Sequence, residues 1–213
     1  MATIPVEITL YEKMNNFFRG YDFLLMTDKK QFRRVTPTGF QNVIFTTTEY
    51  NNETWLEVNF GCRNEQIEQI AQQFLGNTRD YWEDANTLVI SIGKFNNTNY
   101  FRYKILSEQD LEDTCEEIKL FLTEQGFPFL SKYDHLEAIH ELFNKSPHQS
   151  CKYLYNQVHR CFKGAICGKL LNSGDFMSIA EKYRKILNRI GATPEELITY
   201  ERMLGFLVYI SVN

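Results

Sequence analysis

The spacing of apolar residues changes character along the chain. Up to about residue 106, many apolar runs are short, β-branched or alternating with polar residues, which is typical of strands. Beyond residue 131, apolar residues recur at intervals of three and four, which is typical of amphipathic helices. Runs of strands followed by runs of helices predict an α+β fold. We expect an antiparallel sheet with flanking helices, followed by a C-terminal bundle of about four helices.

The front half of the chain is expected to contain three helices and four or five strands. A capping box formed by Ser107 and Asp110 marks the start of the third helix, and Gly126 with Pro128 predicts its end. The last two strands are expected to pair as a hairpin with its turn at 96–99. The predicted helices are 5–19, 64–75 and 107–125, and the predicted strands are 32–36, 40–48, 55–63, 88–92 and 100–106.

The back half is expected to be helical from 131 to 210, with the last helix started by Thr193 and Pro194. Gly164 and Gly168 lie four residues apart, a spacing that allows two helices to cross closely. These patterns predict two domains, an α+β domain at 1–126 and an all-helical domain at 127–213 packed on it. Phe127, Phe129 and Leu130 are expected to lie in the contact between the two halves.

Charge is distributed unevenly between the halves. Residues 1–125 hold 12 basic and 19 acidic residues, a balance of −7, while residues 126–213 hold 11 and 8, a balance of +3. The net charge of −4 argues against general binding of nucleic acid. Nine basic residues within 145–189 leave nucleic acid as a weaker hypothesis, because several could share exposed helix faces.

The sequence shows no motif for a catalytic centre, a metal or a cofactor. Five cysteines and four histidines are present, but their spacing within predicted elements favours a role in the core over zinc binding. No run of 18 apolar residues and no basic, then apolar, leader are visible. We therefore expect a cytoplasmic protein with reduced thiols, no cofactor, no metal and no membrane segment. The sequence indicates no oligomeric state.

Two surfaces are candidates for binding. The helix expected at 107–125 carries a cluster of acids, which indicates either a solvated face or a docking surface for a basic protein partner. The polar face of the sheet, next to an aromatic loop, is the other candidate, because aromatic and arginine side chains often anchor interfaces. The predicted binding residues there are Trp55, Glu57, Asn59, Arg63, Tyr81, Trp82 and Arg102.

The front half resembles a bacterial family of domains of unknown function. The resemblance covers roughly residues 5–125 and rests on the leading helix, the Phe-Arg-Arg strand at 32–34, and the strands at 40–45 and 55–61. It implies a helix followed by antiparallel strands, and it carries over no activity and no catalytic residue. We therefore expect a bacterial, non-enzymatic protein-binding module of the immunity or regulatory partner type. The alternative is a hydrolase or transferase with a site between the halves that uses Glu57, Arg63 or His140.

Overall fold

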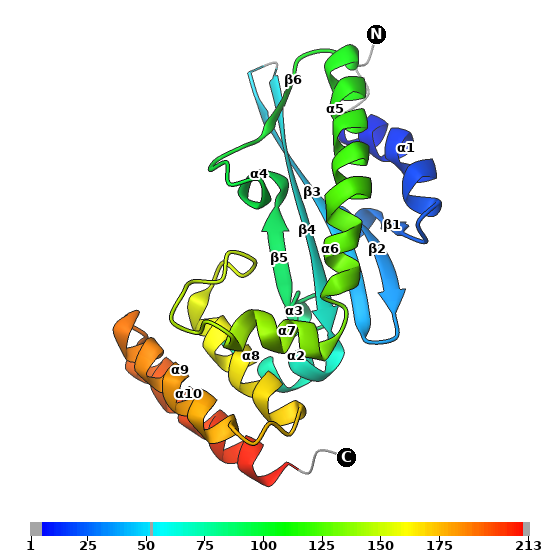
Figure 1. The fold of residues 1–213 in the computed structure, drawn as a ribbon. Coiled ribbons are helices and arrows are strands. Elements are labelled where there is room, and N and C mark those ends of the chain that lie inside the picture. Colours follow the sequence, from blue (N-terminus) through cyan, green and yellow to red (C-terminus); the bar gives the residue numbers. More distant parts are fainter. Residues whose placement is uncertain (1–5, 52, 211–213) are drawn as a thin grey trace. The chain divides into compact units, whose positions relative to one another are not determined.

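A computed structural model of the protein describes residues 6–51 and 53–210. Within these ranges, six strands form one antiparallel sheet, and most of the remaining chain is helical (Figure 1). The α+β fold with C-terminal helices is therefore confirmed. The strands are β1 (Leu24–Met26), β2 (Gln31–Thr36), β3 (Gly39–Tyr50), β4 (Glu53–Asn64), β5 (Leu88–Ser91) and β6 (Tyr103–Ile105).

The helices fall before, between and after the strands. Those flanking the strands are α1 (Val6–Arg19), the 3₁₀ turn η1 (Thr27–Lys29), α2 (Glu65–Ala71), α3 (Arg79–Trp82), α4 (Ile92–Phe95) and α5 (Glu108–Phe121). The others are the π-helical turn η2 (Leu122–Gly126), α6 (Phe127–Lys132), α7 (Leu136–Asn144), α8 (Gln157–Leu170), α9 (Phe176–Arg189) and α10 (Pro194–Tyr209).

The strand order is β1-β2-β3-β4-β5, and β6 also pairs with β4. The hairpin expected between 88–92 and 100–106 is therefore wrong. The Ser91 side chain accepts a hydrogen bond from the Lys94 backbone and starts α4, so the chain leaves the sheet directly after β5. It returns at the other end of β4, where Thr54 lies opposite Ile105. β5 and β6 thus pair with different segments of one long strand.

The chain divides into two compact units. The first extends to Cys62 and includes Val89–Lys132, while the second comprises Arg63–Leu88 and the chain from Tyr133 onward. These units differ from the expected division at 126, because residues 63–88 group with the C-terminal helices. A buried ion pair joins residues 63–88 to these helices, because the Lys163 ammonium of α8 lies 2.7 Å from the Glu68 carboxylate of α2.

In the first unit, α1 and α5 lie over one face of the sheet (Figure 1). Aromatic rings fill the space between them, and the Phe18 and Phe32 ring centroids are 4.0 Å apart. Phe127 stacks on Phe23 at 5.3 Å, and Phe129 lies 5.6 Å from Phe60. Phe127 and Phe129 are thus part of the core of the first unit, where we had expected a contact between the halves.

The helix that begins at Ser107 does not end at Gly126, contrary to expectation. The capping box of Ser107 and Asp110 is present, but α5 passes through η2 directly into α6. The wider π turn accommodates Pro128, because a proline cannot donate to, and clashes with, the carbonyl of a regular preceding turn. Gln41 of β3 also fixes α6, by donating a hydrogen bond to the Leu130 carbonyl at 3.3 Å.

In the second unit, α8 contacts α2, α7, α9 and α10. The close crossing expected at Gly164 and Gly168 is confirmed: a Cβ at Gly164 would lie 2.4 Å from the Tyr183 hydroxyl of α9. That hydroxyl donates to the Phe143 carbonyl at the end of α7, at 2.7 Å. The buried Arg160 guanidinium also donates to Phe143, at 2.8 Å, so one end of α7 is tied to two neighbouring helices.

Candidate functional site

The structure brings together four of the seven residues predicted on the polar sheet face. Arg102 Nε lies 3.3 Å from Glu57 Oε2, and Asn59 Nδ2 lies 3.5 Å from Glu57 Oε1. Trp55 lies opposite Lys104 across the β4–β6 pair, with the Lys104 ammonium 5.7 Å from the ring centroid. The face is thus polar and internally paired, and its binding role stays a prediction.

The other three residues belong to the second unit. Arg63 is only 5% exposed, contrary to the exposed position expected. Its guanidinium donates to Glu65 at 2.6 Å and to the carbonyls of Trp82 and Ala85 at 2.7 and 3.0 Å. Trp82 donates its ring N–H to a backbone carbonyl, while Tyr81 is about half exposed. Arg63 therefore organises the loop that follows α2.

The enzyme alternative relied on Glu57, Arg63 and His140. Glu57 and Arg63 have the partners given above, and the His140 ring nitrogen contacts the Asn144 amide at 2.9 Å. All five cysteines are buried and free, and burial is the main cause that raises the pKa of the Cys115 thiol. Within the part of the chain that the structure describes, no three His, Cys, Asp or Glu side chains are grouped to hold a metal ion.

The basic segment at 145–189 is less available than its sequence indicates. Arg160 and Lys163 are 3% and 2% exposed, so neither lies on an outer helix face as expected. Arg184 forms ion pairs with both Glu181 and Glu201, the latter at 2.6 Å. Three of the basic residues expected to attract nucleic acid are therefore either buried or paired with acids.

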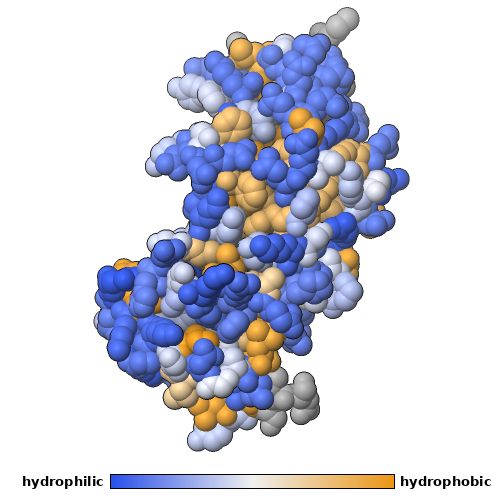
Figure 2. Space-filling view, viewed as in Figure 1, coloured by the Kyte–Doolittle hydropathy of each residue, from blue (hydrophilic) through white to orange (hydrophobic). Residues whose placement is uncertain are grey.

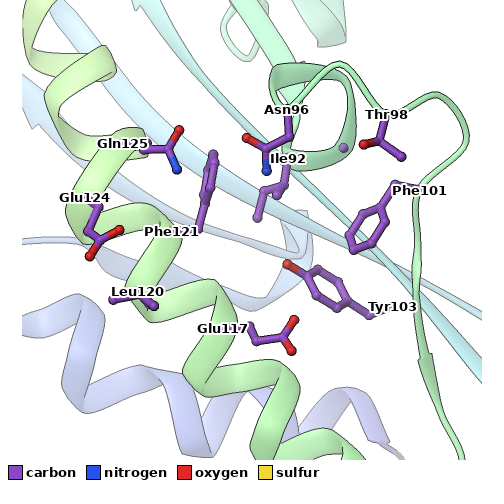
Figure 3. A pocket seen from close by; sticks show the side chains of 11 residues that line it. Ile92, Asn96, Thr98, Phe101, Tyr103, Glu117, Leu120, Phe121, Glu124 and Gln125 are labelled. Carbon is purple, nitrogen blue, oxygen red and sulfur yellow. The ribbon is translucent and has the colours of Figure 1, made fainter.

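A pocket of about 300 Å³ lies in the first unit, between α4 with its following loop and α5 with its π turn (Figure 3). Its lining combines apolar side chains and aromatic rings with carboxylates, amides and the Tyr103 phenol. Figure 3 shows the Tyr103 hydroxyl directed toward the space between the two elements, with the Glu117 carboxylate beside Tyr103. The lining residues used below are Ile92, Asn96, Phe101, Tyr103, Glu117, Leu120, Phe121, Glu124 and Gln125.

Local backbone constraints hold the loop side of the pocket. A Cβ at Gly93 would lie 2.4 Å from the Phe101 Cβ, so only glycine allows this close approach. The Thr98 N–H donates to the Gly93 carbonyl at 2.8 Å. Asn97 and Tyr100 have φ angles of 59°, and this left-handed conformation costs an aromatic residue such as Tyr100 on the order of 1–3 kcal/mol. Strain of this kind occurs frequently at functional sites.

Tyr103 and Glu117 are electrostatically coupled. Burial raises the pKa of Tyr103 to about 12, and the Glu117 carboxylate contributes in the same direction. The phenol is therefore neutral at physiological pH and can either donate or accept a hydrogen bond. Glu117 itself is exposed at the opening, where solvent reaches it.

The acids of α5 and η2 form two groups. Glu108 and Glu112 lie 3.9 and 3.5 Å from the Lys13 ammonium of α1, and Glu116 pairs with Lys119 at 2.7 Å. Among the residues that the structure describes, Glu117 and Glu124 have no ion-pair partner. Glu117 and Glu124 therefore place uncompensated negative charge beside the pocket. Asp113 of the same helix accepts a hydrogen bond from the Gln109 amide and is likewise without an ion-pair partner among the described residues.

Exposed apolar side chains accompany these carboxylates. Leu120 is 59% exposed and Phe101 is 38% exposed, and both line the pocket. Figure 2 shows the corresponding apolar surface between α4 and α5, bordered by hydrophilic side chains. An apolar surface with a polar border is the usual appearance of a site for a ligand or a protein segment.

The sequence identified Glu117 as a member of an acidic cluster but did not identify the pocket. The apolar residues named for that helix were Leu111, Cys115, Ile118 and Leu122, which are buried, and they included neither the exposed Leu120 nor the buried Phe121 that line the pocket. Their spacing with Glu117 and Glu124, at intervals of three and four, is the signal that places all four on one helix face. The opposite wall was missed because the strands at 88–92 and 100–106 were expected to pair as a hairpin, with no helix between them, whereas α4 begins at Ile92.

A scan against models of protein families, a search of curated proteins and a search of solved structures each find no match to this chain. The resemblance of residues 5–125 to a bacterial family of domains of unknown function therefore stays a prediction. Of the helices in the described ranges, none is long and apolar enough to cross a membrane.

Proposed function

We propose that the protein is a non-enzymatic binding module that docks a basic segment of a protein partner at the pocket between α4 and α5. The observation that carries this proposal is the position of unpaired charge beside apolar surface, since Glu117 and Glu124 line the pocket together with exposed Leu120. By contrast, Glu112 and Glu116 on the same helix are paired with lysines. Complementary charge increases the rate and specificity of association. Exposed Leu120 and Phe101 supply the apolar contact that holds a bound segment.

The proposal fits an immunity or regulatory partner, since such a protein acts by occupying another protein. It makes the α5 surface, as opposed to the polar sheet face, the first place to test. On the sheet face, Glu57 and Arg102 neutralise each other, whereas the pocket retains charge for an incoming partner.

The test is a titration of the full chain with two fluorescent peptide libraries of equal length, one of lysine, arginine and leucine, the other of aspartate, glutamate and leucine. We expect the basic library to bind, with an affinity that falls as salt is raised because exposed charges are screened. The double variant Glu117→Gln with Glu124→Gln should weaken binding at least about tenfold, as expected for two charge-assisted contacts.

The matched control is Glu108→Gln with Glu112→Gln, which removes two carboxylates from the same helix that already pair with Lys13. This control should change the affinity by less than about threefold. Equal binding of the acidic library, or equal effects of the two double variants, would contradict the proposal.

A further inference from the structure

We propose that the pocket itself receives one organic cation carried on an aliphatic stem, the side chain of a lysine or arginine of the partner. This inference rests on the proposed function and names the group that enters the pocket. It depends on four lining residues, Glu117, Tyr103 and the rings of Phe101 and Phe121.

The walls select the stem. Ile92, Phe101 and Phe121 present apolar surface on several sides of the space (Figure 3). Lysine and arginine bury their methylene groups along such surfaces while the charged end reaches polar groups. A cation also gains electrostatic attraction from nearby aromatic faces.

The polar groups select the charge. An occupant covers Glu117 and the Tyr103 hydroxyl, and burying a carboxylate without a compensating charge is unfavourable. A neutral apolar side chain leaves that cost in place, and an acidic side chain increases it. A cation removes it by pairing with Glu117, while the Tyr103 hydroxyl and the amide oxygens of Asn96 and Gln125 are available as further acceptors.

The same groups disfavour a metal ion. Calcium and magnesium require shells of six or more oxygen ligands, with several carboxylates or waters close together. Here three of the lining residues are aromatic, and in Figure 3 the Glu117 carboxylate lies beside Tyr103, whereas Glu124 lies farther from that ring. Glu117 is thus the carboxylate beside Tyr103 that pairs with the cation, and Glu124 adds negative charge that attracts the partner.

The experiment uses two-dimensional NMR of the full, isotopically labelled chain with four probes at matched ionic strength: n-butylammonium, n-butylguanidinium, n-butanol and magnesium chloride. We expect one or both organic cations to shift resonances of residues 92–103 and 117–125. Tighter binding of n-butylammonium would identify lysine as the better occupant, and tighter binding of n-butylguanidinium would identify arginine. Butanol and magnesium should leave these resonances unchanged.

Three variants separate a binding role from a structural one. Glu117→Gln should weaken cation binding about tenfold or more, and Tyr103→Leu should weaken it because both ring and hydroxyl are lost. Tyr103→Phe retains the ring and should restore part of the binding. Each spectrum also reports whether the variant is folded, and an unfolded Tyr103→Leu variant leaves the Glu117→Gln comparison to decide.

The outcomes distinguish this inference from the proposed function. If basic peptides bind through Glu117 and Glu124 but neither organic cation shifts the pocket resonances, the docking surface stands and the cation pocket is wrong. If the cations bind but no basic peptide does, the pocket is a small-molecule site and protein docking is wrong. Equal shifts with butanol would overturn the cation assignment, because the pocket would then recognise only the alkyl stem.

Discussion

The buried ion pair of the second unit provides the sharpest prediction about stability. Lys163 and Glu68 are 2% and 0% exposed, and the Lys163 ammonium also donates to the Asn86 carbonyl at 2.8 Å. Lys163→Met preserves the apolar stem but leaves the Glu68 carboxylate buried without a counter-charge. Thr87 and Gln72 still donate to that carboxylate, at 2.8 and 2.7 Å.

Breaking a buried pair by removing one partner costs about 3–5 kcal/mol. Since two donors to Glu68 remain, we expect Lys163→Met to lower the free energy of unfolding by about 3 kcal/mol, at the lower end of that range. Adding Glu68→Gln removes the unpaired charge, so the double variant should be more stable than Lys163→Met alone. This non-additivity is the signature of a direct interaction.

The assay is urea unfolding followed by tryptophan fluorescence. The chain has two tryptophans, Trp55 in the first unit and Trp82 in the second. In a Trp55→Phe background, Trp82 reports on the unit that contains the ion pair. Lys185→Met is the control, because Lys185 is 74% exposed and should change the unfolding free energy by less than about 0.5 kcal/mol. A Lys163→Met effect no larger than this control would refute the reasoning.

Three further predictions concern packing, ionisation and thiol reactivity. Gly164→Ala should destabilise the protein by about 1–3 kcal/mol, because the new methyl group meets the Tyr183 hydroxyl. Gly205→Ala has open space around it and should stabilise α10 by up to about 1 kcal/mol. Urea midpoints that shift in the same direction in both variants would contradict this. Because the pKa of Tyr103 is raised from 10.0 to about 12, its contribution to stability is complete below pH 10 and is lost as the pH rises through 12. The difference in tyrosinate absorbance between wild type and Tyr103→Phe should show this ionisation. A Tyr103 titration near pH 10 would contradict the prediction. The five cysteines should react slowly with a thiol reagent in the native protein and quickly in denaturant, because all five are buried. Burial also raises the pKa of Cys161 to about 12, which keeps that thiol protonated. A rapidly reacting thiol in the native protein would contradict the buried positions.

Hydrophobic periodicity and capping residues were sufficient for most of the fold. The capping boxes at Ser107 and Thr193 are present, and the strand alternation at 55–63 matches β4. These signals are local, so a single segment reveals them. The pairing of β6 with β4 is not local, because it depends on where α4 and its loop lead the chain after Ser91.

The errors at Gly126 and Arg160 have a common physical origin. Glycine and proline usually end helices, but here the wide π turn and packing of Phe127 and Phe129 carry the helix through both. Basic residues are usually exposed, but Arg160 and Lys163 find carbonyl and carboxylate partners inside the second unit. In each case the outcome depends on contacts with residues distant in the sequence, which the local pattern does not reveal.

The candidate site was likewise only partly predictable from the sequence. The acidic cluster of α5 was visible in the sequence, while the separation into paired and unpaired acids depends on Lys13 of α1, about a hundred positions away. The pocket also requires the strained loop after α4. The sequence therefore predicted the charge of the surface, and the structure located the part of that charge available to a partner.

Charge reversal at the pocket tests the central claim most directly. In the variant Glu117→Lys with Glu124→Lys, the exposed carboxylates that line the pocket become ammonium groups, while Glu112 and Glu116 keep their lysine partners. The measurement is the ratio of affinities for the basic and acidic peptide libraries, taken on wild type and variant with matching unfolding midpoints. The account predicts that wild type prefers basic peptides and that the variant prefers acidic ones. A variant that still prefers basic peptides would show that the partner docks elsewhere.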